Sequence, residues 1–140
     1  MSERILEGKF YVTGKAEGIL IKSEKPISFW GGLDPEEGRI IDKRSDIAGR
    51  VVAGKILAFT EGIGSSTTSA VLLESVMNST NPLAIINVTT EPILVSGALV
   101  AKEFYEAEIP IVSISPGDYE RLDDGDEVLV DGGRGVVEFN

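Results

Sequence analysis

The sequence predicts an α/β fold with a parallel βαβαβ core and additional β-strands, including a C-terminal hairpin. From residue 55 onward, short apolar runs alternate with longer segments of helical character, which is typical of parallel strands joined by helical crossovers. The last 14 residues hold two apolar runs on either side of a Gly-Gly turn, as in a hairpin. A length of 140 residues predicts one domain, 1–140, large enough to bury a core.

The first third of the chain contains short strand-like runs separated by glycine-rich turns. The predicted strands are residues 10–13, 17–21 and 39–42, with a short apolar segment at 26–30. The only tryptophan, Trp30, stands beside Gly31-Gly32 at the start of a turn-rich loop. A tryptophan in this place is most often a packing residue, but a double glycine also lets the backbone approach a ligand or a neighbouring chain closely. Both interpretations stay open. Residues 43–46 are interpreted as a solvated turn with local backbone hydrogen bonds.

The alternating part of the chain supplies the predicted core. Its predicted elements are a strand at 55–59, a helix at about 65–78, a strand at 83–88, a helix at 93–106 and a strand at 110–114. Gly97 in the second helix is expected to allow close packing. In the first helix we expect one apolar face, formed by Ala70, Leu73, Val76 and Met77. The hairpin follows at 127–131 and 135–139; the acidic run before it lacks EF-hand spacing and is interpreted as a solvated loop.

Composition narrows the function classes. A formal net charge of −10 argues against nucleic-acid binding, which depends on Lys and Arg neutralising phosphates. No apolar run approaches the roughly 20 residues of a membrane span, and the N-terminus lacks signal-peptide character, so we expect a cytoplasmic protein. The chain has no Cys and no His, so we expect no metal site in it. Its chemistry must use hydroxyls, carboxylates, Lys, Arg or backbone donors unless another chain supplies the rest.

The stretch from Thr60 to Ser69 is the clearest candidate site. Two glycines and five consecutive hydroxyl residues stand between a predicted strand and a predicted helix. The first N–H groups of a helix lack internal partners and carry partial positive charge, so such a place holds anions. One hydroxyl is needed for an N-cap, and five exceed that need, so capping and ligand binding both stay open. Gly62-x-Gly64 continues into neither a dinucleotide fingerprint nor a P-loop, so no nucleotide is indicated.

Several motifs together resemble the small subunit of aconitase X. Residues 61–72, Glu-Gly-Ile-Gly-Ser-Ser-Thr-Thr-Ser-Ala-Val-Leu, resemble the Gly-Ser-Ser loop and helix of aconitase swivelling domains. Residues 42–47, Asp-Lys-Arg-Ser-Asp-Ile, are similar to the Asp-x-x-Ser/Thr-Asp-x-Ile segment of that domain. Residues 26–35, Pro-Ile-Ser-Phe-Trp-Gly-Gly-Leu-Asp-Pro, resemble the archaeal aconitase X members. With Glu91 and Gly97-Ala98, the resemblance covers nearly the whole chain.

The resemblance implies a swivelling β/β/α fold and a heterodimer with a large subunit that carries a 4Fe-4S cluster. It implies a hydro-lyase acting on a phosphorylated hydroxy acid: mevalonate 5-phosphate would lose water to give trans-anhydromevalonate 5-phosphate in the archaeal mevalonate route to isoprenoids. A bacterial branch of the family instead dehydrates cis-3-hydroxy-L-proline. A third alternative comes from the loop alone, namely a non-catalytic module that binds a phosphorylated ligand.

The resemblance also implies the site residues. Ser65 matches the proton acceptor, the first Ser of the Gly-Ser loop. Candidates for substrate binding are Gly64, Ser66, Thr67, Ser45 and Asp46. Candidates for the subunit interface are Trp30, Gly31, Gly32, Asp34 and Arg44, because the partner must cover the open face of the site and because Trp and Arg are enriched at interface hot spots. One departure matters: aconitases proper have Arg where this chain has Thr67, which argues against citrate as the substrate.

Overall fold

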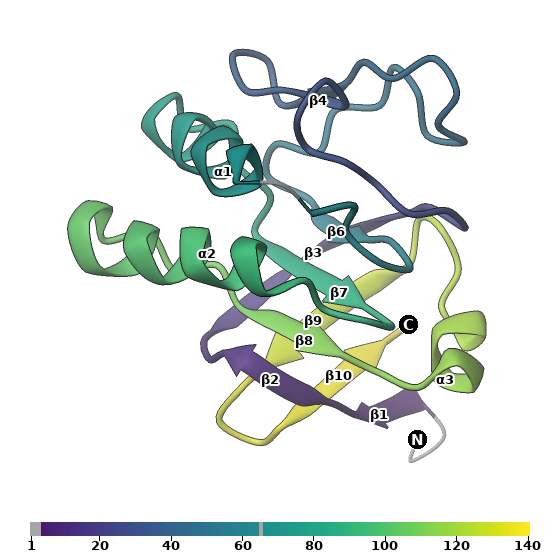
Figure 1. Ribbon diagram of the computed structural model, residues 1–140. Coiled ribbons are helices and arrows are strands. Elements are labelled where there is room, and N and C mark those ends of the chain that lie inside the picture. Colours follow the sequence, from purple (N-terminus) through teal and green to yellow (C-terminus); the bar gives the residue numbers. More distant parts are fainter. Residues whose placement is uncertain (1–3, 65) are drawn as a thin grey trace.

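A large curled sheet forms the frame of the molecule, which is a computed structural model describing residues 4–64 and 66–140 (Figure 1). Its strand order is β1-β10-β9-β3-β6-β7-β8-β2. The strands are β1 (Ile5–Glu7), β2 (Lys9–Val12), β3 (Lys15–Lys22), β6 (Ile56–Ala58), β7 (Ala84–Asn87), β8 (Ile111–Ser113), β9 (Glu127–Asp131) and β10 (Val136–Phe139). Strands β3, β6, β7 and β8 are parallel, and β9 and β10 form an antiparallel hairpin. The predicted parallel core and C-terminal hairpin are therefore confirmed.

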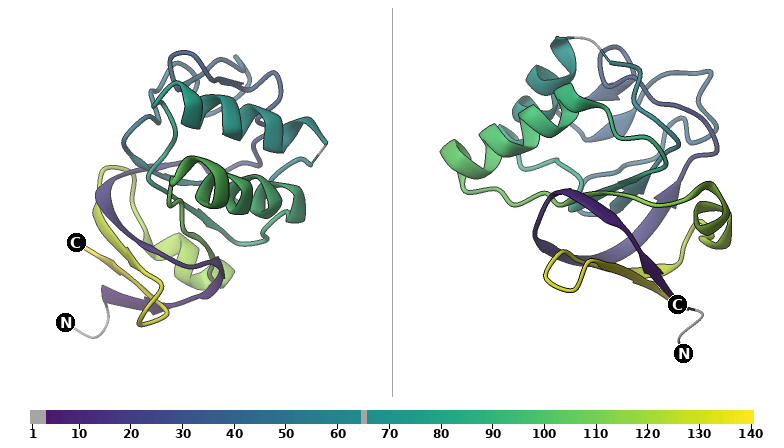
Figure 2. Two further views of the ribbon diagram at one scale, coloured as in Figure 1. Left: turned by 90° about the vertical axis from the view of Figure 1, so that its left-hand side faces the viewer. Right: turned by 60° about the horizontal axis from the view of Figure 1, so that its bottom comes forward.

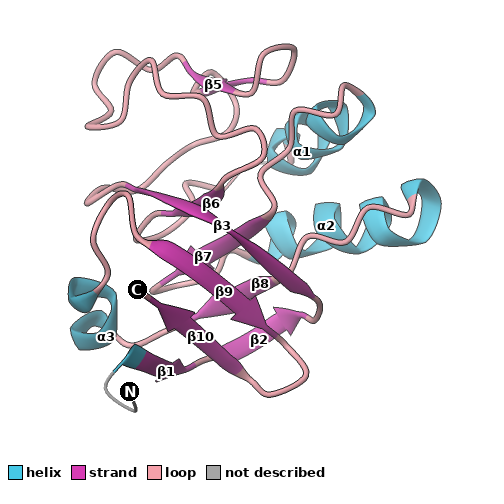
Figure 3. Ribbon diagram, turned by 180° about the vertical axis from the view of Figure 1, so that it is seen from behind, coloured by secondary structure: helices cyan, strands magenta, loops and turns pink. Residues whose placement is uncertain are grey.

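The sheet curls because its two edge strands follow each other in the chain. β1 pairs with β10 at one edge, β2 pairs with β8 at the other, and Gly8 alone separates them. A Cβ atom at Gly8 would collide with the Val112 side chain, so glycine lets the chain pass close to β8. Figure 3 shows the hairpin of β9 and β10 in front of the parallel strands, as expected for a β/β/α arrangement.

Strands β6, β7 and β8 are buried on both faces, and alternate residues enter two separate cores. In β6, Leu57 packs beneath the helices, whereas Ile56 and Ala58 enter the core enclosed by the curled sheet. Burial of both faces explains why these strands are continuous apolar runs. Helices α1 (Thr67–Met77) and α2 (Pro92–Tyr105) lie side by side over one face (Figure 2). A short helix that the sequence analysis did not predict, α3 (Pro116–Arg121), places Tyr119 in the enclosed core.

The inward face of α1 differs from the predicted one. Its buried residues are Thr68, Leu72 and Ser75. Of the four predicted residues, Val76 packs against the core, Leu73 is half-buried, and Ala70 and Met77 are exposed. At its crossing with α2 the helix lies very close, because a Cβ at Gly97 would be 2.9 Å from the Cα of Ser69. The predicted role of Gly97 in close packing is confirmed.

A long, mostly irregular segment between β3 and β6 covers the top of the molecule in Figure 1. It contains the two-residue strands β4 (Leu33–Asp34) and β5 (Arg39–Ile40), which pair with each other. Its apolar side chains enter the core beneath the helices: Ile27, Phe29, Leu33, Ile40, Ile47 and Val52. The backbone at Ile27 also forms a parallel bridge with Gly62. None of the helices formed by residues 4–64 and 66–140 has the length and apolar character needed to cross a bilayer.

Candidate functional site

Two strand–helix junctions lie next to each other at the carboxyl ends of β6 and β7. The amides of Val88 and Thr89 both donate to the carbonyl of Thr60, each at 3.0 Å, and Glu61 forms a parallel bridge with Thr89. In open parallel sheets, ligands bind at this edge. The structure thus places the candidate loop at 60–69 beside the start of α2 at this edge of the sheet.

The junction that begins α2 is closed by its own side chain. Glu91 is the N-cap, and its carboxylate accepts hydrogen bonds from the amides of Ile93 at 2.8 Å and Leu94 at 3.0 Å. Pro92 follows at the first helical position, where its missing N–H costs nothing. The first donors of this helix are therefore satisfied within the chain.

The junction that begins α1 is built differently. Ser66, which directly precedes Thr67, already has helical backbone angles (φ −59°, ψ −20°), and its side chain caps no amide of residues 4–64 and 66–140. The loop before it lies tightly against Glu91, because a Cβ at Gly64 would be 2.7 Å from the Glu91 Cδ atom. Ser66 is exposed and Thr67 is half-buried. The predicted proton acceptor, Ser65, lies outside the residues that the structure describes.

A groove of about 350 Å³ connects this loop to the turn at residues 42–47. Its lining includes Ile27, Gly32, Asp42, Arg44, Ser45 and Ile63. A larger hollow of about 470 Å³ lies on the outer face of β3, β9 and β10. Its lining includes the carboxylates of Glu17, Glu127 and Glu138, which disfavour an anionic ligand. The groove beside Ile63 is therefore the better candidate for a phosphorylated substrate.

The turn at residues 42–47 is held by its own polar groups. The Ser45 amide donates to the Asp42 carbonyl at 3.1 Å, and the Ser45 hydroxyl accepts from the Ile47 amide at 3.2 Å. The carboxylate of Asp42 accepts from the backbone amide of Arg44 at 2.9 Å and from its side chain at 3.3 Å. These hydrogen bonds, the backbone one foremost, lower the pKa of Asp42.

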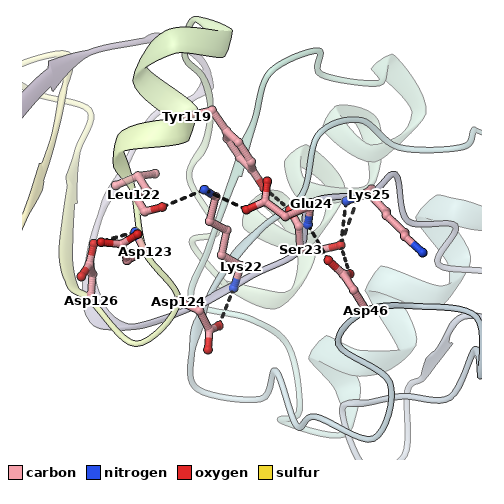
Figure 4. Close-up of polar contacts among 10 residues, drawn as sticks. All are labelled: Lys22, Ser23, Glu24, Lys25, Asp46, Tyr119, Leu122, Asp123, Asp124 and Asp126. Atoms are coloured by element: carbon pink, nitrogen blue, oxygen red, sulfur yellow. Dashed lines mark hydrogen bonds and ion pairs between the residues drawn. The ribbon is translucent and has the colours of Figure 1, made fainter.

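Asp46 is not among the residues that line the groove, and its carboxylate binds the turn that follows β3. Its carboxylate accepts one hydrogen bond from the Ser23 hydroxyl and another from the Glu24 amide, the latter at 2.7 Å (Figure 4). Of the two predicted substrate ligands in this turn, only Ser45 lines the groove. Substrate binding by Asp46 stays a prediction, and the structure adds a local anchoring role.

The structure separates the interface candidates into exposed and structural residues. The Trp30 residue is 64% exposed, whereas its neighbour Phe29 is 1% exposed and packs against Phe59, so the packing interpretation of Trp30 is wrong. The Arg44 side chain is 92% exposed, and Gly31 is also exposed. Gly32 is buried, and a Cβ there would collide with the Ser28 carbonyl, so this glycine shapes the loop. The Asp34 carboxylate accepts from the Glu36 amide at 2.9 Å and so stabilises the turn.

Sequence reasoning missed a buried polar cluster behind Asp46 (Figure 4). The ammonium of Lys22 donates to the Leu122 carbonyl at 2.7 Å, pairs with Glu24 at 3.1 Å and lies 4.8 Å from the centre of the Tyr119 ring. The Tyr119 hydroxyl donates to the Ser23 carbonyl at 2.6 Å. Burial is the main cause that raises the pKa of Tyr119, and the negative charges of Glu24 and Asp46 add to it. The Tyr119 hydroxyl therefore stays protonated. The one sequence signal was a lysine ending an apolar strand.

Three layers, with a glycine-and-hydroxyl loop at the carboxyl edge of the parallel strands, define a swivelling domain of the aconitase type. The sequence profile of the aconitase X swivel domain matches residues 5–139, and the chain belongs to that family. A crystal structure of Thermococcus kodakaraensis aconitase X in its holo form superposes with a TM-score of 0.87 at 42% identity, covering 97% of this chain and 98% of the other. The predicted fold class and family are thus confirmed.

Curated relatives carry dehydratase names. The phosphomevalonate dehydratase small subunit of Methanosarcina acetivorans is 40% identical over 135 residues, which span 96% of this chain and 90% of that protein. The cis-3-hydroxy-L-proline dehydratase of Hypocrea jecorina is 40% identical over 127 residues, which span 91% of this chain but only 21% of that protein. These names confirm the predicted hydro-lyase class at the level of the family.

Proposed function

We propose that this chain is the small subunit of a two-subunit hydro-lyase that dehydrates mevalonate 5-phosphate to trans-anhydromevalonate 5-phosphate. The observation that carries the proposal is the match to the Methanosarcina acetivorans small subunit, which spans nearly the full length of both proteins at 40% identity. The junction before α1 supports it, and we call it the open junction because the Ser66 side chain caps no amide of the described residues. Short hydroxyl side chains at a helix N-terminus suit a phosphorylated, anionic substrate.

A larger partner is part of the proposal. The region that matches this chain makes up only 21% of the Hypocrea jecorina enzyme. The rest of that enzyme has no counterpart in this chain, so in the proposal a separate large subunit supplies it. The sequence contains no Cys and no His, and the described residues form no group of three or more side chains suited to a metal ion. This chain therefore does not fit a 4Fe-4S cluster, and in the proposal the cluster belongs to the large subunit.

In the proposed reaction, Ser65 takes the carbon-bound proton. The C–H electron pair then forms the carbon–carbon double bond as the C–O bond breaks and hydroxide leaves. Ser65 returns its proton to solvent and the hydroxide takes up one proton, so that substrate equals product plus one water. A free serine is a poor base; backbone N–H groups at the start of α1 would stabilise its alkoxide in a site closed by the partner. Gly64, Ser66, Thr67, Ser45 and Asp46 are the proposed substrate contacts.

The partner has to cover the face that bears the groove. Exposed apolar side chains stand near it, namely Trp30, Ile41 and Ile63, and Arg44 extends from the same turn as Ser45. We assign Trp30, Gly31 and Arg44 to direct contact with the large subunit. Gly32 and Asp34 act by shaping the loop that carries Trp30.

The test is a substrate comparison with the assembled enzyme. The chain is co-expressed with its large subunit, the complex is assembled anaerobically, and mevalonate 5-phosphate is compared with cis-3-hydroxy-L-proline. The proposal requires dehydration of the phosphorylated substrate. Preference for the hydroxyproline would support instead the alternative suggested by the Hypocrea jecorina relative.

Calorimetry on the isolated chain tests the remaining alternative of a binding module without catalysis. A small phosphorylated ligand should bind such a module in the absence of any partner. The half-enzyme proposal expects little heat under the same conditions, because the partner completes the site.

A further inference from the structure

The buried polar cluster of Lys22, Ser23 and Tyr119 contacts the turn that carries Ser45 and Asp46 through the hydrogen bond from Ser23 to Asp46. We infer that Tyr119, Lys22 and Ser23 are positioning residues: they fix the end of β3, to which Asp46 is anchored, and so place Ser45 at the substrate groove. The inference rests on the proposed function for its kinetic consequence. Its structural part stands on the contacts alone.

The first step is the anchoring of Asp46. Both carboxylate oxygens are used at the end of β3, one by the Ser23 hydroxyl and the other by the Glu24 amide at 2.7 Å. Ser23 is fully buried, and its own amide donates to the carbonyl of Ala58 in β6 at 2.9 Å. The Asp46 carboxylate is therefore attached to the central sheet through one short polar turn.

The second step concerns two hydrogen bonds, from Tyr119 to Ser23 and from Lys22 to Leu122, which we call the clamp. Tyr119 and Leu122, nearly a hundred residues away in sequence, hold Ser23 and Lys22 through hydrogen bonds of 2.6 Å and 2.7 Å. The Lys22 side chain is only 6% exposed. A buried cation with good partners gives little net stability over an apolar replacement, so fixing position is the better account of its presence. The Tyr119 ring beneath the ammonium adds a third partner.

The third step connects the clamp to the groove. Ser45 precedes Asp46, and its amide and hydroxyl are both engaged inside the same turn, with Asp42 and Ile47. The turn therefore moves as one unit. If the anchor of Asp46 shifts, Ser45 shifts with it, and Ser45 lines the groove that would hold the substrate. A loosened clamp should therefore weaken substrate binding more than it slows the chemical step.

The test variant is Tyr119→Phe in the assembled enzyme, because it removes one hydroxyl and keeps the ring beneath Lys22. We expect the KM for mevalonate 5-phosphate to rise about 5- to 10-fold, with kcat within about twofold of wild type. Val137→Ala is the matched control, since Val137 lies in the same enclosed core and has no part in the cluster. Loss of stability alone reduces the amount of active enzyme and leaves KM unchanged.

Two further measurements make the outcome decisive. Ser23→Ala should raise KM as well, and the double variant should be less than additive because both changes act on one turn. In the isolated full chain, Tyr119→Phe should speed hydrogen exchange at the amides of Glu24 and Ile47, whereas Val137→Ala should not. A wild-type complex that leaves mevalonate 5-phosphate untouched overturns the proposed function, and the exchange measurement still tests the clamp. A Tyr119→Phe enzyme with wild-type KM, or unchanged exchange at those two amides, overturns the inference.

Discussion

The junctions that begin α1 and α2 lie at the same edge of the sheet, yet the chain completes them in different ways. At α2, Glu91 satisfies two backbone amides with one carboxylate. At α1, the Ser66 side chain caps no amide of the described residues, and the first turn carries no acidic group. Glu91 gives α2 an internal cap that contributes stability, whereas the first turn of α1 presents short hydroxyls and no acidic side chain of its own, which suits an anionic ligand.

The junction that begins α2, which Glu91 closes, also supports the open junction that begins α1. A Cβ at Gly62 would lie 3.2 Å from the Glu91 Cβ, and a Cβ at Gly64 would be closer still to its carboxylate. The helices themselves approach closely where Gly97 meets Ser69. Capping by Glu91 therefore does two things: it stabilises α2 and gives the loop of the open junction a fixed surface to lie on.

The largest expected effect is at the open junction. Ser65→Ala should reduce turnover by about 10²- to 10⁴-fold, the range that a positioned base contributes, while subunit association and melting temperature stay unchanged. Ser96→Ala is the matched control, because Ser96 is an exposed serine near the start of α2. Steady-state kinetics of the assembled complex measure both. Near-normal turnover in Ser65→Ala removes this residue from the chemistry.

The second prediction concerns the partner that must cover the open junction. Trp30→Ala should weaken binding of the large subunit by about 2 kcal/mol or more, because an exposed aromatic side chain at an interface often dominates affinity. Phe104→Ala is the control, since Phe104 is also an exposed aromatic residue but lies near the C-terminal end of α2, outside the proposed interface. Titration of the large subunit measures affinity. An isolated Trp30→Ala chain that melts much earlier than wild type contradicts the assignment.

At the closed junction we expect a loss of stability. Glu91→Ala should lower the free energy of unfolding by about 1–2 kcal/mol, because two helix-start amides lose their acceptor. Glu91→Asp keeps a capping carboxylate and should recover much of the loss. Denaturant unfolding of the isolated chain measures both variants. Unchanged stability in Glu91→Ala would falsify the view that this junction is sealed by its side chain.

The smallest expected effect on stability is at Ser66. Replacing an N-cap serine by alanine commonly costs about 1 kcal/mol, but this side chain makes no capping bond with the described residues, so Ser66→Ala should cost less than about 0.5 kcal/mol. As a proposed substrate contact, it should instead raise KM. A stability loss of the usual size with an unchanged KM means that Ser66 is an ordinary cap.

The sequence predicted the fold where local pattern and tertiary environment agree. Strands β6, β7 and β8 are apolar because both faces are buried, and a run of that kind is visible without a structure. The missed elements are short: β1 has three residues and α3 has six, too few for a periodic pattern. The face of α1 was predicted only in part: Val76 packs against the core as predicted, but Leu72 is buried and Ala70 and Met77 are exposed, because the apolar residues of this helix do not all lie on one face.

The candidate site also has a part that the sequence could predict and a part that it could not. The Gly-Ser loop and the turn at 42–47 are contiguous motifs, so resemblance could identify them, and the structure brings Ile63 and Ser45 to one groove. The exposure of Trp30 could not be predicted, since Phe29 beside it fits the core equally well by composition. The clamp from Tyr119 to Ser23 joins segments 96 residues apart, so the lysine at the end of β3 could mark one end of it but only the folded chain reveals the pairing.

The most direct test of the central claim is product formation by the anaerobically assembled complex, followed by NMR. Mevalonate 5-phosphate, mevalonate without the phosphate, and cis-3-hydroxy-L-proline are supplied separately at equal concentration. If the open junction of α1 serves a phosphorylated hydroxy acid, trans-anhydromevalonate 5-phosphate accumulates from the first substrate and the other two turn over far more slowly. Equal rates with and without the phosphate, or faster dehydration of the hydroxyproline, would contradict the account.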